Sequence, residues 1–307
     1  MTDGPASTEP LLAFWGKAGS ASIVHPALCH MIDVGVVTSR YLRRCASGAL
    51  LDHLAGPFGG DVEHATAFLV LLAAAHDMGK ISPGFQAKRD DLTGPLRSRG
   101  LPFRPTDVKD HGEVTRLALR DHLTGTDGWN RKAATRAAAV AGSHHGEFRV
   151  GIGTGGGLGG RPWAEARSTA IRRLEQLFGT TFGGARDALA APPASWCLVA
   201  AGLITVADWL ASSDDHFPFA GGAVASLESY AADAETKADE VLQDAGFAGW
   251  RADGPAATFD RLFPGWTPHD LQTRVRRLVG GSAGPSLIVV EAPMGIGKTE
   301  AALFAAD

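Results

Sequence analysis

Cysteine is scarce in this chain. The 307 residues contain only three, Cys29, Cys45 and Cys197, and none of them forms a C-x-x-C pair. Three separated thiols exclude a disulfide framework and favour a reducing compartment, so we expect a cytoplasmic protein. Long apolar runs are missing too, because the two longest, 68–75 and 196–207, are shorter than the ~20 residues that cross a bilayer. We therefore expect no membrane span, and the first residues show no secretory signal pattern.

Net positive charge is absent as well. The formal net charge is −4 at pH 7, which excludes a generic basic coat for nucleic acid. It does not exclude nucleic acid as a substrate, because bound divalent metals would make one site locally positive on an acidic protein. With 45% hydrophobic and 20% charged residues, the composition is that of an ordinary globular protein. The length permits one large domain or two smaller ones.

Strand patterns are missing up to about residue 246, and no internal repeat is visible. We expect a mainly α domain over 1–245, followed by a different segment over 246–307. The Pro- and Gly-rich stretch 80–105 predicts a long loop. The glycine run 151–160 predicts a mobile surface loop or, alternatively, a lid. Apolar spacing and capping residues predict helices at about 26–44, 61–78, 112–123, 131–144, 167–177, 195–212 and 223–245.

Histidines and aspartates in apolar surroundings are the most informative residues that are present. His76 and Asp77 directly follow the apolar run 68–75, and Asp208 interrupts another apolar segment. An ionised carboxylate is costly to bury unless an opposite charge or a metal compensates it. We therefore expect two divalent metals with Asp77 as a bridging ligand. The remaining ligand candidates are His30, His111 and the doublet His144-His145.

Such a site favours hydrolysis of a phosphodiester. Imidazole-rich ligation suits Fe, Mn, Co, Ni or Zn better than Mg or Ca. Two ions can activate a water and stabilise both oxygens of an in-line displacement. Lys80, just after the His76-Asp77 pair, is placed to contact a phosphate. Ser212 lies four residues after Asp208 on the same helical face, where its hydroxyl could reach a phosphate or water. Asp77, Lys80 and Ser212 are thus the catalytic candidates.

Four segments accompany these residues: FWGK near the start, LCHMIDV around His30, SHHGEF and ADWLASS. With the order of the histidines and aspartates, they resemble the HD nuclease domain of the type I CRISPR-associated helicase-nuclease. The resemblance covers essentially the whole chain, because a superfamily 2 helicase follows the HD domain in that family. It implies an HD-domain helical bundle that cuts single-stranded DNA, exposed by an RNA-guided surveillance complex, and is coupled to an ATP-driven 3′–5′ helicase. It also implies two metal sites sharing Asp77, one with His30, His76 and Asp208 and one with His111, His144 and His145.

A second motif, APMGIGKT at 292–299, matches a phosphate-binding loop with Ala292 in place of the first glycine. Because it follows a β-branched run and precedes a helical pattern, we expect a strand, loop and helix that begin a truncated RecA-like α/β segment. The glycine turn would admit backbone N–H groups to the phosphates, the lysine would meet the β/γ oxygens, and the threonine would meet Mg²⁺. A glutamine upstream resembles the one that reads adenine. The nucleotide-binding candidates are therefore Gln272, Gly295, Gly297, Lys298 and Thr299.

The segment that resembles the beginning of a helicase contains few of the motifs that ATP hydrolysis requires. The sequence holds neither a Walker B carboxylate nor an arginine finger after this loop, so we expect no ATPase or helicase activity from the 307 residues. ATP turnover that Lys298→Ala abolishes would contradict this expectation.

Two other functions stay open. One is an HD phosphohydrolase acting on nucleotides, which the extra histidines and the helicase start disfavour. The other is an inactive docking module on the surveillance complex, which the intact ligand set disfavours. We interpret His25 and the other histidines as helix-start, surface or packing residues. Basic clusters that could contact DNA, but are also typical of solvated helix faces, contain Arg40, Arg43, Arg44, Lys88, Arg89, Arg131 and Lys132.

Overall fold

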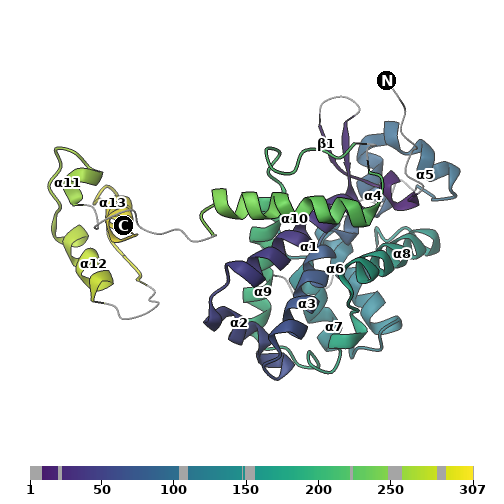
Figure 1. The fold of residues 1–307 in the computed structure, drawn as a ribbon, viewed down its shortest axis with the longest axis horizontal. Coiled ribbons are helices and arrows are strands. Elements are labelled where there is room, and N and C mark those ends of the chain that lie inside the picture. Colours follow the sequence, from purple (N-terminus) through teal and green to yellow (C-terminus); the bar gives the residue numbers. More distant parts are fainter. Residues whose placement is uncertain are drawn as a thin grey trace. The chain divides into compact units, whose positions relative to one another are not determined.

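The computed structural model describes residues 9–19, 23–103, 110–146, 148, 156–221, 224–247, 258–281 and 288–306. The chain divides into two compact units, Met1–Gly249 and Trp250–Asp307 (Figure 1). The predicted boundary at 245/246 lies four residues before this division. The main hydrophobic core of the described residues lies wholly within the first unit.

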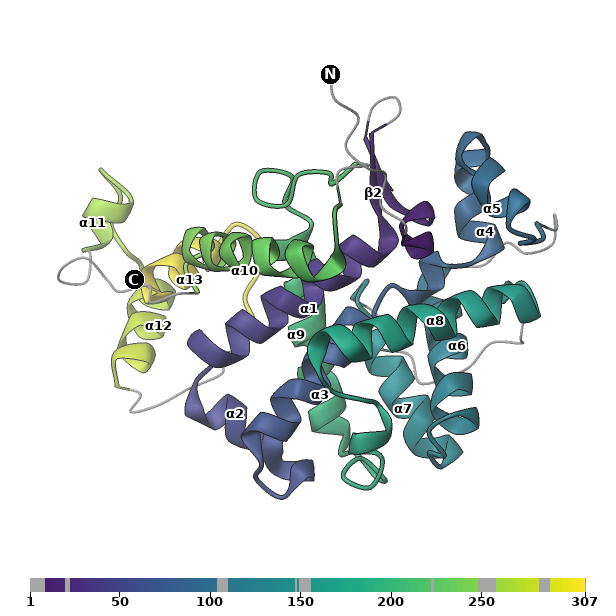
Figure 2. The same ribbon diagram turned by 45° about the vertical axis from the view of Figure 1, so that its right-hand side comes forward.

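The first unit is a helical bundle, which confirms the prediction of a mainly α domain. Helix α1 (Ala27–Arg44) runs through its middle and packs against α3 (Val62–Ala74), α9 (Ala194–Ala211) and α10 (Leu227–Asp244) (Figure 2). Residues 27–38 of α1 are all buried, because neighbouring helices cover it on several sides. The longer helices that complete the bundle are α2 (Gly48–Ala55), α6 (His111–Gly125), α7 (Arg131–Ala141) and α8 (Arg161–Phe178).

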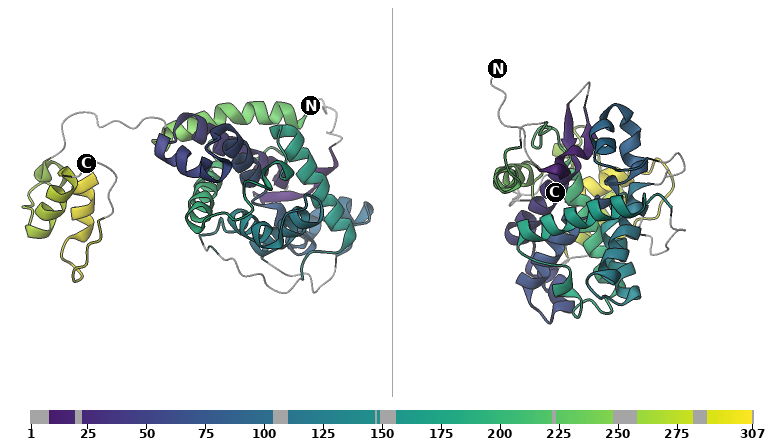
Figure 3. Two further views of the ribbon diagram at one scale, coloured as in Figure 1. Left: turned by 90° about the horizontal axis from the view of Figure 1, so that it is seen from below. Right: turned by 90° about the vertical axis from the view of Figure 1, so that its right-hand side faces the viewer.

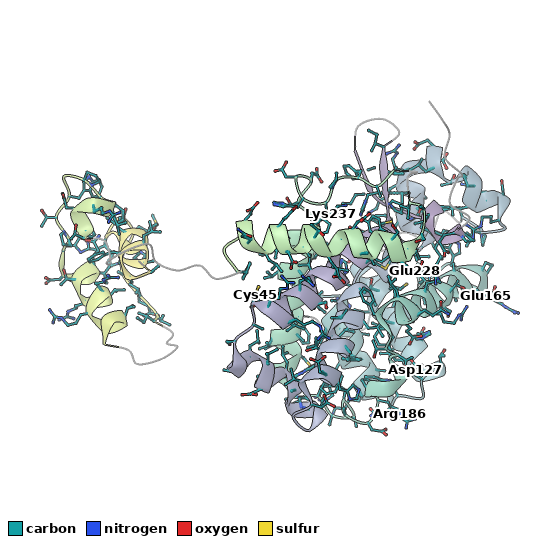
Figure 4. All side chains as sticks on the ribbon, in the orientation of Figure 1. Cys45, Asp127, Glu165, Arg186, Glu228 and Lys237 are labelled. Carbon is teal, nitrogen blue, oxygen red and sulfur yellow. The ribbon has the colours of Figure 1, made fainter. Side chains whose placement is uncertain are left out.

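Helix α10 has two different faces. Its buried face packs on α1, while Glu228 and Lys237 lie on opposite flanks of that face (Figure 4). On another side of the bundle, α6 and α7 pack against each other, and α6 also contacts the short helix η3 (Met78–Lys80) (Figure 3). These contacts bring together chain segments that carry histidines.

Two short strands correct the expectation that the first domain contains none. After the short helix η1 (Pro10–Ala13), β1 (Trp15–Ala18) pairs antiparallel with β2 (Val24–Pro26). Strands of four and three residues are too short to produce a recognisable alternation in the sequence. A Cβ added to Gly16 would lie 2.7 Å from the Cα of Ala27, so glycine is needed for β1 to lie this close to the start of α1.

The stretch 80–105 is not one long loop, because its residues up to 98 form short helices. Besides η3, these are α4 (Pro83–Gln86), η4 (Ala87–Leu92) and α5 (Gly94–Ser98). Proline is favourable in the first turn of a helix, and the side chain of Ser82 caps α4 by accepting from the Phe85 N–H. Pro83 and Pro95, two of the prolines that predicted a loop, therefore start helical turns.

Two helices end earlier than predicted, and both are followed by histidines. Helix α3 begins at its predicted cap, Asp61, but ends at Ala74 instead of residue 78. Helix α7 ends at Ala141 instead of residue 144. In addition, α2 was not predicted, α8 begins six residues earlier than the predicted 167, and the glycine run at 151–155 lies outside the described residues.

Helix α9 is apolar and long enough to cross a membrane. The two helical segments 48–58 and 62–80, which are bent against each other, would also be long and apolar enough if they formed one span. In the first unit, however, α9 packs against α1 and α7, and 44% of its apolar window is buried. It also carries Asp208. Helix α9 is therefore a packed helix of the bundle, although Leu198 and Trp209 on it are exposed.

The second unit contains three helices in its described residues: α11 (Phe259–Leu262), α12 (Asp270–Gly280) and α13 (Lys298–Ala306). The rings of Phe259 and Phe304 meet edge to face at 5.2 Å between centroids. The strand expected before the phosphate-binding loop is not formed over its described part, 288–291. A strand needs a neighbour to satisfy its backbone N–H and C=O groups, and no described segment of this unit supplies one. The loop and the helix after it are formed.

Candidate metal centre

The turn after α3 places His76 and Asp77 in the interior of the first unit, where they are 0% and 1% exposed. The Nδ1 atom of His76 donates to the carbonyl oxygen of Ala73 at 2.9 Å. This bond orients the ring so that Nε2 faces the interior. Histidines that bind metals are commonly oriented by such a bond from the other ring nitrogen.

The carboxylate of Asp77 has a different group of imidazoles on each oxygen. Its Oδ2 lies 3.4 Å from Nε2 of His30 and 3.3 Å from Nε2 of His76. Its Oδ1 lies 3.4 Å from the Nε2 atoms of both His111 and His144. Asp77 is therefore in the position of a bridging ligand between two groups of histidines.

The first group is completed by Asp208, which projects from the last turn of α9. Its Oδ1 lies 3.0 Å from Nε2 of His30, in the first half of α1, and 3.5 Å from Nε2 of His76. The Ser212 hydroxyl donates to the same oxygen at 3.3 Å. We call His30, His76, Asp208 and Oδ2 of Asp77 the α9 group.

The second group joins the first residue of α6 to the turn after α7. The Nδ1 atom of His144 donates to the carbonyl oxygen of Ala141 at 3.1 Å, which repeats the arrangement at His76. The Nε2 atoms of His145 and His111 lie 2.8 Å apart, and burial lowers the pKa of His145. We call His111, His144, His145 and Oδ1 of Asp77 the α6 group.

Glycines allow the backbones that carry these ligands to approach closely. A Cβ added to Gly79 would lie 1.8 Å from the carbonyl oxygen of His111, and one added to Gly142 would lie 2.6 Å from the carbonyl oxygen of Gly112. The Gly79 N–H also donates to the hydroxyl of Thr115 in α6, at 2.8 Å. These contacts hold the turn after α3, the start of α6 and the end of α7 together.

Burial sets the charge of several of these histidines. It lowers the pKa of His30 to about 3 and that of His111 to about 4. Burial also opposes the charge of His76, but the carboxylates of Asp77 and Asp208 outweigh it and raise its pKa to about 9. Neutral imidazoles can bind a metal directly, whereas a metal would have to displace a proton from His76.

Both carboxylates are ionised although burial alone would raise their pKa values. The ammonium of Lys80 and the ring of His76 hold the pKa of Asp77 well below its usual range. The hydrogen bond to His30 and the nearby ring of His76 lower the pKa of Asp208 strongly. The Lys80 Nζ lies 2.6 Å from Oδ2 of Asp77 and its side chain is nearly buried, so it compensates part of the negative charge.

The donor set fits divalent metal ions. Three buried atoms, Nε2 of His76, Nε2 of His144 and Oδ1 of Asp77, have no hydrogen-bond partner. Buried polar atoms rarely lack a hydrogen-bond partner unless an ion or a water molecule binds them. Within each of the sets His30-His76-Asp77, His111-His144-His145 and His76-His144-Asp208, the ligand atoms lie within 4.8 Å of one another. All seven residues predicted as metal ligands are thus brought together.

The centre opens into a cavity of about 370 Å³ that the sequence did not reveal. Lys80 and Ser212 line it, as predicted candidates. Its other wall comes from β1 and from the segment around α4. Residues there that were not predicted as site residues are Trp15, Gly16, Lys17 and Phe85.

A second buried polar cluster lies beside His30 and was also missed. His25 donates through Nε2 to Asp33 at 3.0 Å and accepts from the Ala220 N–H through Nδ1 at 3.1 Å. The Tyr230 hydroxyl donates to both oxygens of Asp33, at 2.9 and 3.0 Å. This network ties β2, α1 and α10 together one turn away from His30. The signal that could have revealed it is Asp33 itself, a carboxylate in the apolar run of α1.

Most residues of the predicted basic clusters form ion pairs with carboxylates and do not line the metal cavity. Asp239 pairs with both Arg40 and Arg44. Similarly, Arg43 pairs with Glu63, and Arg89 pairs with Asp91. Arg131 and Lys132 are exposed on α7. Of the predicted basic residues, Lys88 lines the cavity of the metal centre.

The nucleotide-binding candidates gather around a separate cavity of about 430 Å³ in the second unit. Gly295 and Gly297 have φ angles of 77° and 74°, which glycine adopts without strain. The Lys298 Nζ donates to the carbonyl oxygens of Ala292 and Pro293 at 2.7 and 2.8 Å. The amide of Gln272 donates to the carbonyl of Gly297 at 3.4 Å. Thr299 lines the same cavity.

Comparison with known proteins gives a consistent result. The family model described as Cas3, HD domain matches residues 15–217. The CRISPR-associated endonuclease/helicase Cas3 of Thermus thermophilus is 34% identical over 308 residues, which cover 97% of this chain and 32% of that protein. The chain thus spans about a third of the length of this relative.

Solved structures agree in fold. The crystal structure of a CRISPR-associated protein superposes with a TM-score of 0.71 at 31% identity, over 96% of this chain and 34% of that one. The Thermus thermophilus Cas3 HD domain, crystallised in the presence of Ni²⁺, superposes with a TM-score of 0.56 at 28% identity. That comparison covers 80% of this chain and 93% of the HD domain.

Proposed function

The chain belongs to the Cas3 HD-domain family, and we propose that it is a two-metal nuclease that cuts single-stranded DNA in type I CRISPR interference. The observation that supports this most directly is the Asp77 carboxylate, whose two oxygens each face a different group of imidazoles. This arrangement would allow one carboxylate to be shared between two ions. Such a pair of ions supplies an activated water and stabilises the attacking and leaving oxygens of a phosphodiester.

The residues of this chain have separate roles in the proposal. The α9 group and the α6 group would each hold one ion, with Asp77 shared. Lys80 lies against Asp77, so its ammonium is positioned to bind a phosphate oxygen at the same place. The Ser212 hydroxyl, beside Asp208 and in the wall of the cavity, would orient water or phosphate. The imidazole-rich set favours Fe, Mn, Co or Ni over Mg.

The proposal also includes a partner complex and coupling of the nuclease to an ATP-driven helicase. The curated relative is named an endonuclease/helicase and CRISPR-associated, which supports an RNA-guided surveillance complex as the partner. The phosphate-binding loop and Gln272 would bind ATP with Mg²⁺ in a longer protein that carries the rest of the 3′–5′ helicase. Loss of fluorescent ATP binding in Lys298→Ala would support the assignment of this loop, and unchanged binding would oppose it.

The test of the nuclease is cleavage of circular single-stranded DNA by metal-stripped protein. Mn²⁺, Ni²⁺, Co²⁺, anaerobic Fe²⁺ and Mg²⁺ would be added back in turn, with Asp77→Ala as the site variant. The matched control is Asp52→Ala, because Asp52 is an exposed aspartate on α2. Cutting with transition metals that only Asp77→Ala loses is the expected result. Hydrolysis of nucleotides without cutting would instead support a phosphohydrolase, and inactivity on both would support a docking module.

A further inference from the structure

The wall of the metal cavity is basic beyond the metal ligands. Lys17 from β1, Lys80 from η3 and Lys88 from η4 all line it. The cavity-lining residues that the structure describes include only two carboxylates, Asp77 and Asp208, and both belong to the metal groups. Three ammonium groups around one opening, on a chain with a net charge of −4, form a local site for a ligand with several negative charges.

Aromatic rings position one of these lysines. The rings of Trp15 and Phe85 are stacked, with 4.4 Å between centroids and 30° between planes. The Nζ of Lys88 lies 4.8 Å from the centroid of Phe85, and that of Lys80 lies 5.7 Å from it. A cation held over an aromatic ring is attracted by its quadrupole. Phe85 is buried between these groups, so it holds an ammonium at the opening and offers no free face for a nucleobase.

Gln86 fixes the two sides of this wall to each other. It is fully buried, and its amide donates to the carbonyl oxygens of Trp15 and Lys80 at 2.9 and 2.8 Å. Its Oε1 accepts from the Trp15 backbone N–H at 3.2 Å, and its own carbonyl accepts from the Trp15 indole at 3.2 Å. Gln86 is therefore a positioning residue that locks β1, and with it Lys17, against the segment of Lys80 and Lys88.

Lys17 lies at the opening among groups of both charges. Its Nζ donates to the carbonyl oxygen of Ala211, at the end of α9, at 3.3 Å. An ammonium has three N–H donors, so this bond leaves donors for a ligand. Burial and the ammonium of Lys80 lower the pKa of Lys17, and the carboxylates of Asp208, Asp33 and Asp214 offset this only in part. A bound phosphate would relieve this repulsion.

We propose that Lys17 and Lys88 form a phosphate subsite beside the metal centre that binds the strand next to the scissile bond. This subsite rests on the proposed nuclease function and specifies which substrate that nuclease would bind. The substrate is a polynucleotide strand recognised through its backbone, not a mononucleotide, and recognition is independent of base sequence because the ammonium groups contact phosphates, which are the same at every nucleotide. Lys17 would bind a phosphate on the Asp208 side of the opening, because it is bonded to the end of α9. Lys88 would bind one on the His111 side, because it lies over Phe85, whose ring centroid is 5.5 Å from that of His111.

The test compares two substrates of different length. Lys17→Gln and Lys88→Gln would be assayed with Mn²⁺ on a 20-nucleotide strand and on bis(p-nitrophenyl) phosphate, whose single phosphate cannot occupy the scissile position and the subsite at the same time. The control is Lys132→Gln, an exposed lysine on α7 that does not line the cavity. Each subsite variant should raise the KM for the strand by about 5- to 10-fold, as expected for loss of one charge-assisted contact. Hydrolysis of the small diester should stay within a factor of two of wild type.

Salt dependence and binding give independent readouts. Each lost phosphate contact should lower the slope of log KM against log salt by about 0.7 for a single strand. Arginine at either position should restore most of the affinity, whereas a variant that merely failed to fold would lose hydrolysis of both substrates. Equal losses on the two substrates in folded variants, or an unchanged salt slope, would overturn the subsite. If wild type cut neither substrate, the nuclease proposal would fail, and fluorescence anisotropy of strand binding would still decide the subsite: binding unaffected by both lysines would reject it.

Discussion

Replacing Gly79 by alanine tests whether close backbone contact assembles the metal centre. The new Cβ would lie 1.8 Å from the carbonyl oxygen of His111, 2.7 Å from its carbonyl carbon and 2.8 Å from the backbone nitrogen of Thr115. All three atoms belong to the backbone of α6, so no side-chain rotation can make room. The first turn of α6 would have to move by about 1.2 Å to bring the shortest contact from 1.8 to 3.0 Å.

The magnitude follows from two contributions. Overpacking of a buried site costs about 1–3 kcal/mol. The shift also breaks the 2.8 Å hydrogen bond from the Gly79 N–H to Thr115, which contributes about 1 kcal/mol. A loss of roughly 2–4 kcal/mol in the free energy of unfolding corresponds to a fall in Tm of roughly 5–15 °C for a domain of this size. Because His111 moves with α6, the α6 group should lose its ion before the α9 group does.

Thermal melting by circular dichroism and metal content by mass spectrometry measure both effects. Gly202→Ala is the matched control, because this exposed glycine inside α9 has no atom within 4 Å of an added Cβ. Alanine there should stabilise the helix by up to about 1 kcal/mol. A Gly79→Ala protein that binds two ions and melts within 2 °C of wild type would refute the reasoning. If that variant is insoluble, Thr115→Val removes the hydrogen bond alone and should lower Tm by a smaller amount.

Three further predictions concern single side chains. Asp208→Asn should reduce the metal content from two ions to one, because it affects only the α9 group; loss of both ions on mass spectrometry would contradict separate groups. Tyr230→Phe should lower the free energy of unfolding by about 1.5–3 kcal/mol, the range for a bond to a charged acceptor, with an unchanged denaturant slope in urea. Burial raises the pKa of Asp127 from 3.8 to about 6, so the folded state holds this proton more tightly than the unfolded chain does. The stability it contributes is present below pH 4 and is lost as the pH rises through 6. Asp127→Asn should then raise stability at pH 8 by about 1 kcal/mol, after allowance for the partial exposure of the carboxyl, and a pH-independent difference in Tm would contradict this.

The ligand residues could be predicted because they are chemically out of place in the sequence. His76 and Asp77 end an apolar run, and Asp208 interrupts another, so burial without compensation would be costly. The cap of α3 at Asp61 was also visible, because it depends on local hydrogen bonds. The end of α3 was not, since the bond from His76 to Ala73 replaces helix continuation only in the folded interior.

The wall of the cavity could not be predicted for a different reason. Trp15 and Gln86 are 71 residues apart, and nothing in either local sequence indicates that they share three hydrogen bonds, which hold the wall of the cavity together. Lys88 and Arg89 looked equivalent in the sequence, yet one lines the cavity and the other pairs with Asp91. Tertiary contacts of this kind decide which basic residues face a ligand and which are neutralised.

The ends of several helices add partial charges to the metal centre, besides the charges of its side chains. Helices α3 and α7 end just before metal ligands, at Ala74 and Ala141, and α9 ends at Ala211, three residues after Asp208. The macrodipole of a helix places about half a negative charge at its C-terminus and half a positive charge at its N-terminus. With α6 contributing its positive end at His111 and α1 its positive end beside His30, the backbone alone supplies a net charge of about −0.5 at the centre. Transplanting the seven ligands onto continuous helices would therefore reproduce the coordination sphere but lose this part of the attraction for cations.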